Sequence, residues 1–194
     1  MLKAQTFPSS DPVASGRRPS LTAAGMVIWL ASEAMFFGGL FAAYFTLKAN
    51  TTPWHPPGVE LEPAIAGLFT LVLVASSFTI HLGARSAERR DYRGLMRWTV
   101  ITILLAAAFL GNQANEWSNL AFTISSHPFG SAFYLMTGFH GLHVFGGMAA
   151  MALLIARVRQ TGAADQGWVE AITYYWHFVD VVWVGLYLVI FILG

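Results

Sequence analysis

Long apolar segments, separated by short polar stretches, account for most of this chain of 194 residues. A helix needs about 20 apolar residues to cross the hydrocarbon core of a bilayer. Five segments reach this length, at residues 23–47, 64–83, 98–117, 132–156 and 172–193. Each is predicted to be helical, because a lone strand leaves its backbone polar groups without partners in lipid. The pattern therefore predicts an all-α polytopic membrane bundle with five transmembrane helices.

The polar segments divide the chain into a tail and one membrane domain. Residues 1–20 are rich in Pro, Ser and Gly and lack the apolar stretch of a signal peptide. We expect this stretch to be a disordered tail, which leaves 21–194 as a single domain of packed spans. In the loop WHPPGVELEP, prolines prevent a helix before Pro63 and suit the first turn after it.

Basic residues are distributed unequally between the predicted loops. Ten of the eleven Lys and Arg residues lie before the first span, between the second and third, or between the fourth and fifth. Only Lys48 lies in a loop on the opposite side. Because loops rich in Lys and Arg remain in the cytoplasm, we expect a cytoplasmic N-terminus and an external C-terminus.

The composition agrees with a membrane protein and excludes several functional classes. The chain is 56% hydrophobic and 11% charged, whereas soluble domains carry about 25% charged residues. Its net charge of +1 provides no basic surface for nucleic acid. With no cysteine, it has no disulfide, thiol nucleophile or thiolate metal ligand. No G-x-S-x-G motif is present, so a serine hydrolase has no support.

Several ionisable side chains lie inside the predicted spans. They are Glu33 in the first, His140 and His143 in the fourth, and His177 and Asp180 in the fifth. Such residues are expensive in lipid and usually face the protein interior with a partner. The helical rise places Glu33 about 15 Å and Asp180 about 12 Å from the cytoplasmic edge. The sequence thus predicts a polar layer through the middle of the bundle, without specifying its pairs.

Spacing along the helices suggests local groupings within this layer. His140 and His143 are three residues apart and are expected to share a helix face, and so are His177 and Asp180. A carboxylate one turn from an imidazole can hydrogen-bond it and fix its tautomer. Aromatic residues flank Glu33, and this apolar setting favours its neutral form.

Spacing also groups polar residues near the ends of the spans. Gln113 and Glu116 are three residues apart near the outer interface. His81 and Arg85 lie at the inner end of the second span, where they can reach lipid headgroups. Arg157 lies at the inner end of the fourth span. Like the arginines after the second span, it has two interpretations: it sets the topology of the chain, or it binds lipid headgroups.

The residues alone leave different functions open. His140 or His143 with His177 would suit a bis-histidine haem in a stand-alone cytochrome b anchor, whereas a structural pair with Asp180 explains His177 equally well. Glu33 suits either a proton relay or a neutral carboxyl that bonds a neighbouring helix. No third metal ligand follows from the spacing, and no internal repeat favours a transporter.

Three motifs, in this order, resemble subunit III of the haem–copper terminal oxidases. They are SEAMFFGGLFAAYF, FTIS followed by TGFHGLHVFGG, and YYWHFVDVVWVGLYLV, and the match runs from about residue 26 to residue 194. The resemblance implies an accessory subunit of an aa3-type cytochrome c oxidase that has no cofactor of its own. Haem a and copper are then expected in partner subunits, with cytochrome c as electron donor to a complex that pumps protons. It also implies docking on subunit I, contact with a complex that includes subunit II, bound phospholipid and support of proton uptake.

The same resemblance assigns family positions to individual residues. Positions matching the family's buried polar motifs are Glu33, Glu116, His140, His143, Trp176, His177 and Asp180. Glu33 matches the carboxylate of the motif SE-x-x-x-F, which carbodiimides attack in this family. Arg157 falls where the family places a basic residue near lipid headgroups, and we expect His81 and Arg85 to contribute to the same function. No residue is expected to be catalytic or to bind a metal.

The chain departs from longer family members, which have seven spans. It lacks the first two, which form one wall of a lipid cleft, so the cleft is open here or closed by another chain. Five-span members are typical of bacteria, which implies a bacterial plasma membrane. Quinol-oxidising relatives are similar to this chain but have Asp at the position of Glu33. Glu33, together with YYWHFVDVVW, therefore resembles the branch that oxidises cytochrome c. A quinol oxidase subunit is the alternative, and a nitric-oxide-reductase accessory protein has less support.

Overall fold

The computed structural model describes residues 21–55 and 61–194, so the predicted tail 1–20 lies outside the described residues. Its helices are α1 (Leu21–Asn50), α2 (Pro63–Glu88), α3 (Tyr92–Asn119), α4 (Pro128–Thr161) and α5 (Gln166–Tyr187), the last continued by the π-helical turn η1 (Leu188–Ile192). Within the described ranges there is no strand. All five helices are long and apolar enough to cross a membrane, which confirms the predicted all-α architecture.

The helices extend beyond the predicted spans because local capping, not the lipid boundary, sets their ends. The Asp91 carboxylate accepts a 2.9 Å hydrogen bond from the backbone N–H of Gly94 and begins α3 six residues before the predicted span. Asp165 caps α5 in the same way, and Pro63 occupies the first turn of α2 as expected. Gly162 ends α4 with a φ of 70°, a left-handed conformation that favours glycine.

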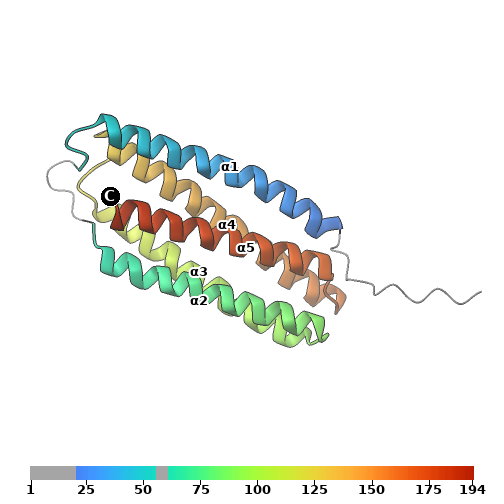
Figure 1. Ribbon diagram of the computed structural model, residues 1–194. Coiled ribbons are helices and arrows are strands. Elements are labelled where there is room, and N and C mark those ends of the chain that lie inside the picture. Colours follow the sequence, from blue (N-terminus) through green and yellow to red (C-terminus); the bar gives the residue numbers. More distant parts are fainter. Residues whose placement is uncertain (1–20, 56–60) are drawn as a thin grey trace, which may run out of the picture.

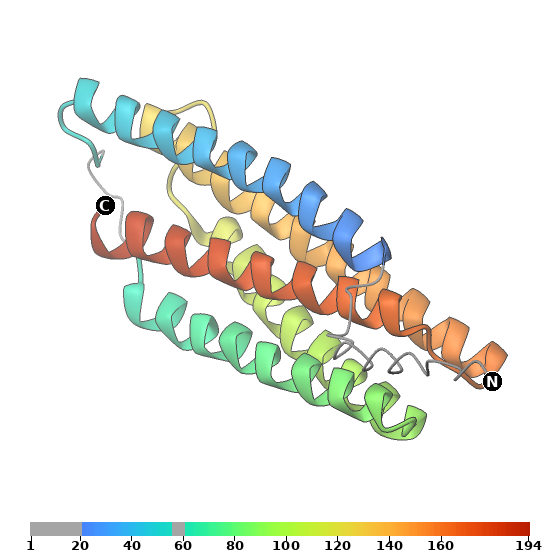
Figure 2. The ribbon, with the colours of Figure 1, turned by 45° about the vertical axis from the view of Figure 1, so that its right-hand side comes forward.

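Helix α5 lies at the centre of the bundle. It packs against α1, α2 and α4, while α3 bridges α2 and α4 (Figure 1). In both ribbon views α1 and α4 lie on one side of α5, and the α2–α3 hairpin lies on the other (Figure 2). Helix α1 is at the edge and buries only Ala23, Phe37 and Tyr44. Its attachment to the other helices therefore depends on few contacts.

Indole groups from α5 pack against hydroxyl groups on α2 in the core. The Trp176 Nε1–H donates to Ser76 Oγ at 2.8 Å, and the Trp183 Nε1–H donates to Thr70 Oγ1 at 2.9 Å. A buried indole is large and apolar but needs one acceptor, which these hydroxyls provide. On the other side, Gly147 of α4 admits the Trp176 ring, since an added Cβ would lie 2.7 Å from it.

Basic side chains gather at one end of the bundle. The turn between α2 and α3 and the turn between α4 and α5 lie at the same end as the start of α1 (Figure 1). The described arginines at this end are Arg85, Arg89, Arg90, Arg93, Arg97, Arg157 and Arg159. Lys48 lies at the opposite end, where its Nζ donates to the carbonyl of Leu193.

Candidate functional site

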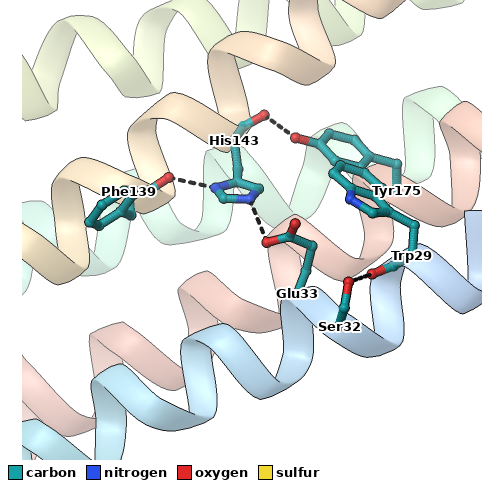
Figure 3. A network of polar contacts seen from close by, with 6 residues as sticks. All are labelled: Trp29, Ser32, Glu33, Phe139, His143 and Tyr175. Atoms are coloured by element: carbon teal, nitrogen blue, oxygen red, sulfur yellow. Dashed lines mark hydrogen bonds and ion pairs between the residues drawn. The ribbon is translucent and has the colours of Figure 1, made fainter.

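Glu33 of α1 and His143 of α4 form a pair between these two helices (Figure 3). Glu33 Oε2 lies 3.2 Å from His143 Nε2, and His143 Nδ1 lies 2.7 Å from the carbonyl oxygen of Phe139. A backbone carbonyl can only accept, so Nδ1 carries a hydrogen. A hydrogen bond between Nε2 and Oε2 then requires one further proton, which either atom can carry. The pair is either an imidazolium with a carboxylate or a neutral imidazole with a carboxylic acid.

Aromatic side chains hold the pair in place. The Tyr175 hydroxyl of α5 donates to the carbonyl oxygen of His143 at 2.8 Å, and Trp29 stacks on the Tyr175 ring with centroids 5.6 Å apart (Figure 3). Phe37 meets the His143 ring edge-on at 5.1 Å. The side chains of His143 and Glu33 remain 16% and 20% exposed. The carboxyl is therefore partly exposed on the surface of this chain, although it lies among aromatic rings.

A second polar group joins α2 to α5 through Ser77. The Ser77 hydroxyl donates to Asp180 Oδ2, and it lies 2.9 Å from His177 Nδ1. Since the hydroxyl has one hydrogen, the His177 Nδ1–H is the donor in the second contact. The expected direct bond between His177 and Asp180 is thus replaced by a bridge from the neighbouring helix. In a hydrolase triad the imidazole lies between serine and carboxylate, which is not the arrangement found here.

His140 and His143 do not act as a unit. The His140 ring is fully buried between Phe109 at 5.8 Å and Trp183 at 4.9 Å, whereas His143 points to α1. Residues three apart differ by about 60° around a helix, and tight packing sends these two rings to different neighbours. The two residues are thus neighbours along α4, as their spacing predicts, but packing gives their rings different partners. Neither nitrogen of His140 has a hydrogen-bond partner in the part of the chain that the structure describes.

The C-terminal half of α3 contributes two more polar residues from the sequence prediction. Gln113 is buried, and its Nε2 donates to the carbonyl oxygen of Thr137 on α4 at 2.9 Å. Glu116 is half-buried and lines a cavity of about 250 Å³ with Glu62 and several asparagines. The two residues therefore have different environments, one between helices and one at the end of the bundle.

The expected lipid ligands lie at the arginine-rich end. The Arg157 guanidinium lies over the Trp168 ring at 5.4 Å, and both line a cavity of about 240 Å³ beside the α4–α5 turn. His81 and Arg85 are exposed near the end of α2. The helix order brings all of these residues to one end of the bundle, with His81 and Arg85 on α2, Arg157 on α4 and Trp168 on α5.

Sequence reasoning missed Ser77 and Tyr175, which complete the two polar groups. Ser77 lies within the apolar run LVLVASSFTIHL, and nothing in its local sequence distinguishes it from Ser76. Tyr175 lies beside the WHFVD motif, but its target is a backbone carbonyl on α4. Both contacts join helices that are far apart in sequence, so only the helix packing reveals them.

Comparison with known proteins identifies the family. The family model for cytochrome c oxidase subunit III matches residues 18–194. The chain belongs to this family. It is 48% identical over 184 residues to the probable cytochrome c oxidase subunit 3 of Mycobacterium leprae, covering 92% of this chain and 91% of the relative. Cytochrome c oxidase subunit 3 of Thermostichus vulcanus is 40% identical over 178 residues, covering 90% and 89% of the two chains.

Membership in the subunit III family confirms the resemblance drawn from the three motifs. Together with five helices of spanning length, it makes the chain a multi-pass membrane protein and a subunit of a terminal oxidase complex. Glu33, His143, His177 and Asp180 are then polar groups that connect the helices of an oxidase subunit.

Proposed function

We propose that this chain is the non-catalytic subunit III of an aa3-type cytochrome c oxidase in a bacterial plasma membrane. The complex passes electrons from cytochrome c to oxygen and pumps protons, with haem a and copper held by partner subunits. The observation that carries the proposal is the family match over 18–194, joined to a polar layer whose groups bond neighbouring helices.

The environments of the histidines support a structural role over a cytochrome b anchor. A bis-histidine haem needs two imidazole nitrogens directed at one iron atom from opposite sides. His143 uses both nitrogens on Phe139 and Glu33, and His177 uses Nδ1 on Ser77. The His140 ring is enclosed by aromatic side chains.

The Glu33–His143 pair supports a role in docking on subunit I and in proton supply. It attaches the edge helix α1 to α4, so it stabilises the outer surface that α1 offers to a neighbour. It also holds one exchangeable proton in the polar layer. Carbodiimides react with a protonated carboxyl, so their family reactivity is expected here at Glu33.

The arginine-rich end supports the proposed orientation and lipid retention. Clustered arginines at the turns favour a cytoplasmic location for this end and for the N-terminus. The cavity of Arg157 and Trp168 combines a guanidinium, which binds phosphate bidentately, with an indole suited to the interface. We propose that it holds a phospholipid headgroup, with His81 and Arg85 providing further positive charge nearby.

Purification through a tag on this chain in mild detergent tests the proposal. We expect oxidase subunits I and II by mass spectrometry, together with haem a, copper and phospholipid. The preparation should oxidise reduced cytochrome c and not quinol; the reverse preference would assign the complex to the quinol oxidases. The isolated chain should give no reduced-minus-oxidised haem spectrum. Recovery of the chain without partners, or a haem band from the chain alone, would contradict the proposal.

A further inference from the structure

A histidine begins helix α4, at the end of the bundle opposite the arginines. The backbone N–H of Phe129 donates to His127 Nδ1 at 3.2 Å, so this side chain is the N-cap of the helix. An imidazole nitrogen accepts a hydrogen bond only while it carries no hydrogen. The cap of α4 is therefore lost when Nδ1 is protonated, whereas α3 and α5 are capped by the carboxylates of Asp91 and Asp165.

The capped turn packs against the loop that follows α1. Phe129 is fully buried, and its ring lies 4.7 Å from the His55 ring and 5.5 Å from the Trp54 ring, measured between centroids. The Trp54 Nε1–H donates to the Tyr44 hydroxyl, which donates to the carbonyl oxygen of Val189, each at 3.3 Å. The first turn of α4 is thus packed on a group that connects the end of α1 to η1.

Basic groups act on the imidazole of His55 in this loop. Burial, together with the charges of Lys48 and His127, lowers the pKa of His55. The acidic groups at this end form no ion pair with either imidazole in the described part of the chain. They are Glu62 and Glu116, which line a cavity of α2 and α3, and the carboxyl of Gly194 beside Tyr44. A cation is also unfavourable at a helix N-terminus. Positive charge on either ring is therefore opposed by its surroundings.

We propose that His127 and His55 form an acid-sensitive latch, in which protonation removes the cap of α4 and loosens the packing of its first turn on the loop after α1. In the neutral form, His127 Nδ1 accepts from the Phe129 N–H and both rings are uncharged. In acid, Nδ1 itself carries a hydrogen, and the new charges repel one another and Lys48. In the orientation proposed above, this end faces the side on which pumped protons are released. That link to turnover rests on the proposed function, whereas the latch does not.

The direction of the pH dependence follows from the same contacts. Because the pKa of His55 is lowered in the folded chain, the stability that its neutral form contributes is present above the ordinary imidazole value of about 6.5. That stability is lost as the pH falls through the folded value. Protonation of His127 acts in the same direction, since it removes an acceptor that the fold uses. We therefore expect the start of α4 to open more often in acid.

Hydrogen–deuterium exchange with mass spectrometry tests the latch in the tagged chain, with the subunits that accompany it, in nanodiscs. Exchange is compared at about pH 7.5 and about pH 5.0, on either side of the ordinary imidazole value, and corrected for the intrinsic pH dependence of amide exchange. Protection of the first turn of α4 should fall about five- to tenfold at the lower pH, as the loss of one cap provides. The first turn of α5, capped by Asp165, is the internal reference and should change by less than about twofold.

Three variants assign the effect to these rings. His127→Asn supplies an amide oxygen, which is a preferred cap and does not titrate, so it should keep protection at the higher pH and lose the pH dependence. His55→Phe keeps a ring against Phe129 and should reduce the fall without abolishing it. His81→Asn, at an exposed imidazole of α2, is the matched control and should leave the full fall. Unchanged protection in the middle of α2 and α3 verifies that each variant is folded.

Three results would overturn the proposal. The first is equal protection of the start of α4 at both pH values in the wild-type protein. The second is an equal fall in wild type and in folded His127→Asn. The third is an equal fall at the starts of α4 and α5, which would show general loosening in acid. Each result is read from this chain, so it is independent of whether oxidase subunits copurify, which tests the proposed function.

Discussion

Replacing Ser77 by alanine tests whether one hydroxyl joins α2 to α5. Its Oγ donates to Asp180 and accepts from His177 Nδ1 at 2.9 Å, so Ser77→Ala removes both contacts. The carboxyl of Asp180 is then left without a partner on either oxygen in the described part of the chain, because Oδ1 already lacks one. Asp180 is only 5% exposed, so solvent cannot replace the lost hydroxyl.

The expected cost follows from these contacts. Interhelical hydrogen bonds in membrane proteins average about 0.6 kcal/mol, so two bonds account for about 1.2 kcal/mol. Stranding a buried carboxyl adds about 1–3 kcal/mol. We therefore expect Ser77→Ala to lower the free energy of unfolding by about 2–4 kcal/mol. Ser118→Ala is the control, since among the described residues the exposed Ser118 hydroxyl bonds only the carbonyl of Asn115 in its own helix.

Denaturation in sodium dodecyl sulfate, followed by tryptophan fluorescence, measures these differences in the purified chain. The double variant Ser77→Ala/Asp180→Leu distinguishes the bridge from simple loss of packing. Because it removes the stranded carboxyl as well as its donor, it should be more stable than Ser77→Ala alone. Equal stability of Ser77→Ala and Ser118→Ala, or strictly additive costs in the double variant, would refute the bridge.

The remaining predictions concern other parts of the bundle. Glu33→Gln should keep assembly and change stability by less than about 1 kcal/mol, since an amide still bonds the neighbouring imidazole; it should abolish carbodiimide labelling, and loss of the chain from the complex would contradict this. Gly147→Ala should destabilise by about 1–3 kcal/mol, because the added Cβ would lie 2.7 Å from the buried Trp176 ring; an unchanged denaturation midpoint would show that the ring moves at no cost. Burial, with the neighbouring charges of Lys48 and a second histidine, lowers the pKa of His55 in the α1–α2 loop. A nuclear magnetic resonance titration of labelled histidine should place its pKa below the ordinary value, and Lys48→Met should raise that pKa; a fall would contradict the assignment.

The helical architecture could be predicted because it depends on properties of short segments. Apolar length identified all five helices, and Pro63 marked the start of α2. The ends were predicted less well, since apolar length reports where lipid begins. Asp91 and Asp165 extend α3 and α5 past that boundary through hydrogen bonds to backbone N–H groups. A capping motif in the loops was the signal that would have located these ends.

The pairing of the polar residues could not be predicted, because it depends on the rotation and neighbours of each helix. Spacing placed His177 and Asp180 one turn apart, but did not reveal that Ser77 of α2 would lie between them. Spacing also suggested that His140 accompanies His143, whereas packing encloses His140 in aromatic rings. The sequence alone therefore indicates that a polar layer exists, but not which residues pair within it.

The assembled layer has a property that bears on function. Each polar group joins neighbouring helices: Glu33 and His143 join α1 to α4, Ser77 joins α2 to α5, and Gln113 joins α3 to α4. Within the described residues, no hydrogen bond between side chains connects one of these groups to another, and His140 bonds none of them. Among the described residues, direct side-chain hydrogen bonds therefore do not link Glu33 to the groups of Ser77 or Gln113. Proton exchange of the Glu33–His143 pair with an adjoining subunit, or with water at the edge of α1, needs no such link and is the arrangement expected of an accessory subunit.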